Sequence, residues 1–405
     1  MPGYVRFWSA TTISVFGTYV TALGLQTLVI LTLGASAFEL GLLNAARWLP
    51  YLLFGLIVGV LVDRLRRKPL LVATDLGRAV LLMAIPALHL AGALTMPALL
   101  VFVFAVGVLS LVFDAADQSF VPRLVPRQAL TVANARLQQA DAVAQTAGPL
   151  LAGGLIKVIG APLAILVDAV SYLVSGLLLA TIRVQEPPPQ PAEHRNLLGE
   201  LREGLAWVYH HRTLAPMALT SHAWFLVNSL LGTAFTAYAL DPRGLDLGAF
   251  GLSVALACGG VAAVLGGSLS GWAERRLDAG PTIVVCHAVI PFAWLLVPLA
   301  SPSTALVLVS LSQFVFWLVM GMMGPIEMSY RQSVTPDGLQ ARMNTTIRSL
   351  NRAAIVAGAP LGGWLAVTFG YGTALWAGVI GFALVALALG LSPFRTASRA
   401  EAEIH

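Results

Sequence analysis

Three charged residues interrupt long apolar segments of the sequence near their middle. They are Asp141, Arg47 and Arg352. A charge at the centre of a bilayer costs at least about 2.5–3.5 kcal/mol on insertion scales, so such residues need a partner or a task. We hypothesise that Asp141 is a protonatable carboxylate that pairs with Arg47 or Arg352 in one state and is released or protonated in another. The alternative is a permanent buried ion pair that only fixes packing.

A second acidic set lies towards one end of its segments. Asp114 and Asp117 occupy one such end, and Glu327 has the same place as Asp117 in a later segment. These acids could bind arginines of a cytoplasmic gate or take up protons at the inner mouth, and a gate or packing role is the favoured interpretation. No metal-ligand spacing, nucleophilic triad or paired catalytic carboxylates occur in the sequence. We therefore expect no enzyme activity, no metal and no cofactor.

The amino-acid composition indicates the kind of protein in which these charges lie. Of the 405 residues, 58% are hydrophobic and only 11% are charged, whereas soluble domains are about 25% charged. The mean hydropathy is +0.82. The apolar excess must face lipid, and the sequence predicts an all-α membrane protein.

Twelve apolar stretches have the length of membrane-spanning helices. The first six cover about 6–33, 38–62, 69–92, 96–121, 131–158 and 161–183, and the second six about 213–240, 248–271, 281–300, 303–330, 341–368 and 371–392. A polar stretch separates the sets, with a proline-rich start and then an amphipathic pattern typical of a helix on the membrane surface. The predicted domains are 1–183, the linker 184–212, 213–393 and a tail, 394–405.

Basic residues predict the orientation of the chain. Nearly all of them fall on one side of a twelve-span arrangement, and only Lys157 and Arg243 fall on the other. The positive-inside rule then places both termini and the linker in the cytoplasm. The net charge of +5 reflects topology, and no nucleic-acid partner is expected because the basic residues are dispersed.

The sequence also repeats itself at an offset of 210 residues. Six residues in or just before the fifth span recur in or just before the eleventh: Pro126, Asn134, Ala147, Gly148, Gly153 and Leu155 match Pro336, Asn344, Ala357, Gly358, Gly363 and Leu365. Two parallel six-helix repeats with a site between them are typical of major facilitator transporters.

A loop motif after the second span strengthens that prediction. The run from Gly59 to Lys68 resembles the major facilitator signature G-x-L-x-D-R-x-G-R-[RK], with Arg66 where a glycine is usual. A carboxylate there can bind an arginine or a helix N-terminus of a neighbouring helix, so it could latch one conformation. The predicted latch residues are Gly59, Asp63, Arg64, Arg67 and Lys68, with Arg123 as a partner.

The fifth span is similar to the antiporter motif of drug exporters, G-P-x-x-G-G. Gly148, Pro149 and Gly153 match, while Ala152 replaces a glycine. Small residues allow close helix approach and proline weakens the backbone ladder, so the element could form a bending seal. Close packing without any transport role is the alternative.

Four longer stretches resemble the enterobactin-exporter-like and macrolide-efflux-like group of bacterial major facilitator proteins: Val62 to Arg78, Phe113 to Arg123, Leu166 to Tyr172 and Pro336 to Gly363. The resemblance implies a monomeric exporter in the bacterial inner membrane, with the lipid bilayer, a hydrophobic or amphipathic small molecule and protons as its partners. An uptake symporter or facilitator remains an alternative, and a transport-inactive receptor is a further one.

In such folds the first, fourth, seventh and tenth spans ordinarily line the substrate cavity. The residues that this arrangement offers are Tyr19, Gln26, His222, Trp224, Asn228, Gln313 and Trp317. Aromatic surfaces with few hydrogen-bond donors suit bulky apolar ligands. Asp168, and Asp75 with Arg78, lie on spans that are normally peripheral, and structural pairing is expected for them.

Overall fold

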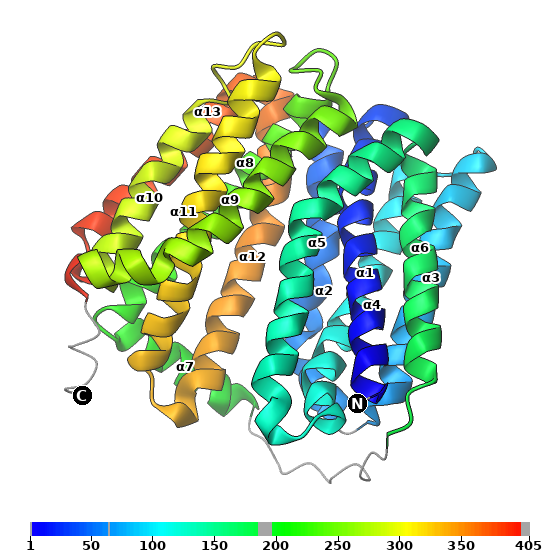
Figure 1. The fold of residues 1–405 in the computed structure, drawn as a ribbon. Helices are drawn as coiled ribbons and strands as arrows, with labels where there is room; N and C mark the ends of the chain where they lie inside the picture. Colours follow the sequence, from blue (N-terminus) through cyan, green and yellow to red (C-terminus); the bar gives the residue numbers. More distant parts are fainter. Residues whose placement is uncertain (1, 64, 185–196, 398–405) are drawn as a thin grey trace. The chain divides into compact units, whose positions relative to one another are not determined.

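The computed structural model describes residues 2–63, 65–184 and 197–397, and within them the chain is almost entirely helical (Figure 1). The first half contains α1 (Pro2–Thr27), α2 (Ala37–Asp63), α3 (Arg67–Leu90), α4 (Met96–Leu124), α5 (Leu130–Ile159) and α6 (Ala161–Ala180). The helix α7 (Leu197–His210) lies in the linker. The second half contains α8 (Leu214–Leu240), α9 (Gly248–Leu277), α10 (Ala279–Leu295), α11 (Ala305–Ser333), α12 (Asp337–Phe369) and α13 (Tyr371–Leu391).

The helices have the length and composition that a bilayer requires. Ten helices of the described part are long and apolar enough to cross a membrane. The apolar helix α10 is shorter, with 17 residues, and α2 is 27 residues long. Because lipid offers no hydrogen bonds to the backbone, continuous helices are the economical way to span it. The predicted all-α architecture of twelve spans in two bundles is confirmed.

The chain divides into two compact units. Unit 1 comprises residues 1–35, 42–194 and 249–257, and unit 2 comprises residues 36–41, 195–248 and 258–405. In unit 1, α1 packs on α5 and α6, and α3 packs on α4 and α6. In unit 2, α8 packs on α12 and α13, and α10 packs on α11 and α13. The second set of contacts repeats the first, helix for helix, as the 210-residue sequence repeat predicts.

Glycines make the repeat visible in the backbone. Gly160 joins α5 to α6 with φ +80°, and Gly370 joins α12 to α13 with φ +86°. A positive φ is unfavourable for residues that carry a Cβ atom, so glycine is suited to both positions. The same tight connection thus recurs 210 residues later. The glycine motif repeats likewise, because Gly148 lies directly against Tyr19 of α1 while Gly358 lies against the backbone of Leu226 in α8.

The linker helix α7 packs on protein. Val208 is fully buried in a small cluster with Ala218, Met343 and Ile347, and Glu203 forms an ion pair with Arg342 of α12. The predicted amphipathic helix is thus present, and at least part of its apolar face is covered by α8 and α12 rather than by lipid. The proline-rich start of the linker, residues 185–196, lies outside the described residues.

Candidate functional site

The mid-span charges of unit 1 occupy one region. Asp141 on α5 and Arg47 on α2 are both exposed, and both act electrostatically on the hydroxyl of Tyr19 on α1. The structure therefore brings together the acid, one of its predicted arginines and one predicted cavity residue. Arg352 lies on α12 in unit 2 and is half-buried. Its pairing with Asp141 stays a prediction.

The predicted gate acids have different partners in the two units. Asp114 accepts a hydrogen bond from the Tyr51 hydroxyl at 2.7 Å, and Asp117 is electrostatically coupled to Asp114, Asp75 and Arg78. In unit 2, Glu327 forms an ion pair with Arg331, one turn further along α11. The acids of unit 1 thus extend a larger network, whereas Glu327 is paired within its own helix.

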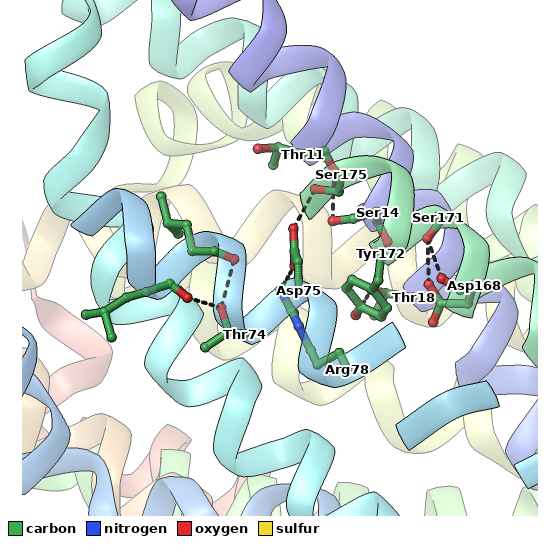
Figure 2. A network of polar contacts seen from close by, with 12 residues as sticks. Thr11, Ser14, Thr18, Thr74, Asp75, Arg78, Asp168, Ser171, Tyr172 and Ser175 are labelled. Atoms are coloured by element: carbon green, nitrogen blue, oxygen red, sulfur yellow. Dashed lines mark hydrogen bonds and ion pairs between the residues drawn. The ribbon is translucent and has the colours of Figure 1, made fainter. Parts of the chain in front are cut away.

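That larger network fills the space between α1, α3 and α6 (Figure 2). Asp75 is completely buried and Arg78 is 5% exposed, and the two form an ion pair one turn apart on α3. Ser175 of α6 donates a hydrogen bond to Asp75 Oδ2 at 2.6 Å. The guanidinium carbon of Arg78 lies 4.3 Å from the ring centre of Phe113 and 4.2 Å from that of Tyr172. The cation is therefore held by one carboxylate and two aromatic rings.

The network continues along α6 towards Asp168. The Tyr172 and Thr18 hydroxyls lie 2.8 Å apart, so α6 is hydrogen-bonded to α1. Asp168 is 1% exposed, and its Oδ1 accepts from Ser171 at 2.8 Å. The pairing expected from the sequence is present for Asp75 and Arg78, whereas Asp168 makes no ion pair with any described residue.

Sequence reasoning placed these residues on peripheral helices and gave them no part in the site. A signal was nevertheless present. Asp75 and Arg78 are three residues apart, and Asp168, Tyr172 and Ser175 are four and three apart, so each set occupies one helical face. Polar residues that share a face inside an apolar helix indicate a buried polar contact.

Unit 2 has an aromatic interior at the corresponding place. Trp224, 7% exposed, is stacked on Phe316 with the ring centres 6.3 Å apart and the planes 2° apart. Trp294 and Phe382 each contact Phe316 as well. Trp224 was predicted to line the cavity, and so was Gln313, which is 3% exposed on α11. Both side chains are buried.

The other predicted cavity residues are more accessible. Tyr19, Gln26, Asn228 and Trp317 are partly exposed. Trp317 packs edge-on against Phe316 and directly against Gly259 of α9. A cavity of about 740 Å³ lies elsewhere, at the end of α1 and α6, and is lined by Arg6, Thr181 and Arg183 together with Gly3 and Ala180. The substrate-cavity assignments stay predictions.

His222 forms a polar cluster at the junction of α7, α8 and α12. Its Nε2 lies 2.6 Å from the Tyr209 hydroxyl, and its Nδ1 lies 2.6 Å from Asn351 Oδ1. Asn351 also bonds Ser221. Asn351 stands 210 residues after Asp141, so the position that carries the predicted proton acceptor in unit 1 carries an amide in unit 2.

The predicted latch is described only in part. Arg64 and the side chain of Asp63 lie outside the described residues, so their proposed contact with Arg123 stays a prediction. Gly59 lies in α2, and Lys68 lies in the first turn of α3. Arg67 donates to the Ser119 hydroxyl at 3.4 Å and to the Leu65 carbonyl at 3.0 Å, which ties the loop after α2 to α4.

The antiporter-like motif packs closely on two helices. Gly148 lies against Tyr19 of α1, and Gly153 lies against Ser253 of α9, within unit 1. Pro149, which follows Gly148 in α5, is also buried. Both glycines therefore lie where helices approach closely, and the role of the motif as a bending seal stays a prediction.

Two packed repeats of apolar helices, with charged groups inside, define a multi-pass membrane transporter. Residues 7–359 match the model of the Major Facilitator Superfamily, and the chain belongs to that family.

Three proteins illustrate which transporters are similar to this chain in sequence. An uncharacterized MFS-type transporter, YvqJ, of Bacillus subtilis (strain 168) is 23% identical over 91% of this chain and 86% of its own. Multidrug efflux pump Tap of Mycolicibacterium fortuitum is 27% identical over 90% of this chain and 88% of its own. Macrolide efflux protein A of Streptococcus pyogenes is 24% identical over 51% of each chain.

Solved structures share the fold. The nucleoside transporter NupG superposes with a TM-score of 0.78 at 11% identity, covering 96% of this chain and 98% of its own. A bacterial homologue of the iron transporter ferroportin gives a TM-score of 0.76 at 15% identity, covering 98% of this chain and 99% of its own. These likenesses concern architecture and carry nothing about substrate.

Proposed function

We propose that this transporter exports a hydrophobic or amphipathic small molecule, of drug, macrolide or siderophore type, in exchange for protons. It would act as a monomer in a bacterial inner membrane, with both termini in the cytoplasm and two halves, 1–183 and 213–393, that rock about the substrate site. Relatives named for macrolide and multidrug efflux support export.

The observation that carries the proposal is the exposure of two opposite charges near the middle of their spans. Asp141 and Arg47 are both exposed in unit 1. Charges at this depth are tolerated where they face a water-filled space or a partner rather than lipid. A carboxylate in such a place can bind a proton from one side of the membrane and release it to the other, which is what antiport requires.

The experiment uses inverted membrane vesicles with an imposed pH gradient, and a macrolide and a fluorescent lipophilic cation as probes. We expect accumulation that a protonophore abolishes. Asp141→Asn should remove most of the pH-driven accumulation, whereas Asp246→Asn, a matched change of an exposed loop carboxyl, should not. If Asp141→Asn retains full pH-driven transport, the role of Asp141 is wrong.

An uptake symporter or facilitator is the second candidate, and the departure of Ala152 from the antiporter motif favours it. Such a protein would equilibrate the probes without regard to the gradient, or accumulate them in right-side-out vesicles. Absence of any flux of either probe would favour the transport-inactive receptor.

A further inference from the structure

We propose that the buried network between α1, α3 and α6 is a proton-binding site and that Asp168 is the group that takes up and releases the proton. The inference deepens the proposed proton exchange, on which its transport role rests. It adds a proton carrier at a place where the sequence had suggested only structural pairing.

The first argument is charge balance. Among the described residues of unit 1, Asp75 and Asp168 are carboxyl groups with 0% and 1% exposure, and the cation buried with them is Arg78. Arg78 is paired with Asp75. With both acids ionised, these three groups would hold one uncompensated negative charge, which the nearby Asp117 does not offset, and an unpaired buried charge is strongly unfavourable. One bound proton removes that cost.

Hydrogen bonds decide which acid holds the proton. Both oxygens of Asp75 are occupied, Oδ1 by Arg78 and Oδ2 by the hydroxyl of Ser175. Asp168 has Ser171 on Oδ1 and Thr21 nearby, and its Oδ2 is buried without a hydrogen-bond partner of good geometry among the described residues. Donors therefore stabilise the ionised form of Asp75 much more than that of Asp168.

A hydroxyl lies beside the Asp168 carboxyl. Thr21 of α1 faces that carboxyl, and its Oγ1 is also buried without a hydrogen-bond partner of good geometry. A hydroxyl carries its own proton and can either donate or accept. Thr21 can therefore accept from Asp168 when the carboxyl is protonated and donate to it when the carboxyl is ionised, so the site can hold both forms.

Asp168 forms no ion pair with a described residue. Gly17 and Thr21 of α1 and Ser171 of α6 lie beside its carboxyl, and the Tyr172 hydroxyl of α6 interacts with it electrostatically. Arg78 and, from α2, Arg47 act on Asp168 electrostatically, without a direct ion pair. Proton release is therefore favoured when Arg78 exchanges Asp75 for Asp168.

A route for the proton is visible on α4. Asp114 is exposed and bonded to Tyr51, and Asp117 is coupled to Asp114 on one side and to Asp75 and Arg78 on the other. One oxygen of Asp117 is buried without a partner. A series of acids thus leads from an exposed position into the network.

The test is an infrared pH titration of the full-length protein in liposomes, which needs no transport substrate. Near neutral pH we expect a carbonyl-stretch band of a protonated carboxyl group that Asp168→Asn removes and the control Asp246→Asn leaves. Asp75→Asn should remove it too, because Arg78 then pairs with Asp168 and the excess charge is gone. An unchanged band in Asp168→Asn overturns the proposal.

Further outcomes separate this inference from the proposed function. If Asp168→Asn fails to fold, the infrared spectrum of Asp75→Asn is the deciding measurement. A protonated-carboxyl band that persists in Asp75→Asn overturns the charge-balance argument and with it the proposal. Wild-type protein with the band but no pH-driven flux would contradict proton antiport and leave the proton site standing. Wild-type protein with pH-driven flux and no such band would contradict the proton site alone.

Discussion

The two halves of this transporter pack their helices in the same order but fill their interiors differently. Positions 210 residues apart on α6 and α13 make the difference explicit: Asp168, Tyr172 and Ser175 of the first half correspond to Gly378, Phe382 and Val385 of the second. The first half builds a hydrogen-bonded network around a buried cation. The second stacks Trp224, Trp294 and Phe382 around Phe316.

This difference shows how one backbone can serve two tasks. In a bilayer, helix association depends on packing and interhelical hydrogen bonds, because lipid is as apolar as the side chains. Aromatic pairs each contribute about 0.5–1.5 kcal/mol beyond burial and tolerate small shifts. A polar network depends on every member being satisfied. The interior network of the first half can therefore respond to protons, whereas the aromatic cluster of the second half provides shape.

The largest expected effect breaks the polar interior. Arg78→Ala leaves Asp75 buried without its cation and should lower the free energy of unfolding by about 3–5 kcal/mol. Arg331→Ala, which breaks the more exposed pair with Glu327, should cost about 1 kcal/mol. Denaturant titration in detergent measures both. The double variant Arg78→Ala with Asp75→Ala should recover much of the loss. Equal stability losses from Arg78→Ala and Arg331→Ala would refute the contrast between the buried network of the first half and the Arg331–Glu327 pair of the second.

A reciprocal exchange of one hydroxyl tests the comparison at matched positions. Phe382→Tyr buries a hydroxyl among aromatic rings at a residue only 1% exposed, and it should cost about 2 kcal/mol if the hydroxyl finds no partner. Tyr172→Phe keeps the ring over Arg78 and loses only the bond to Thr18, which should cost about 1 kcal/mol. Thermal unfolding ranks the stability losses of the two variants. A larger loss for Tyr172→Phe than for Phe382→Tyr would show that the second interior accommodates a hydroxyl and would contradict the comparison.

Much of the fold was predictable from the sequence because the relevant signals are local. Apolar length, basic loops and the 210-residue repeat indicated twelve spans in two halves. The site was less accessible, since it depends on which helix faces meet. Asp75 and Arg78 were recognised as a pair within one helix, whereas their contact with Tyr172 and Ser175 arises only when α3 packs on α6. Trp224 likewise became an interior residue through its contacts with α11 and α13.

The smallest effect concerns the polar cluster that the second half does contain, where α7 meets His222. Burial raises the pKa of the Tyr209 hydroxyl, so above its ordinary value of about 10 the unfolded chain loses this proton before the folded one does. The stability that Tyr209 provides is then complete below pH 10 and falls as the pH rises further. Tyr209→Phe should cost about 1 kcal/mol at neutral pH through its bond to His222. The difference in the free energy of unfolding between the wild type and Tyr209→Phe should become smaller towards about pH 11. A difference that does not change with pH would show that Tyr209 ionises equally in the folded and unfolded states.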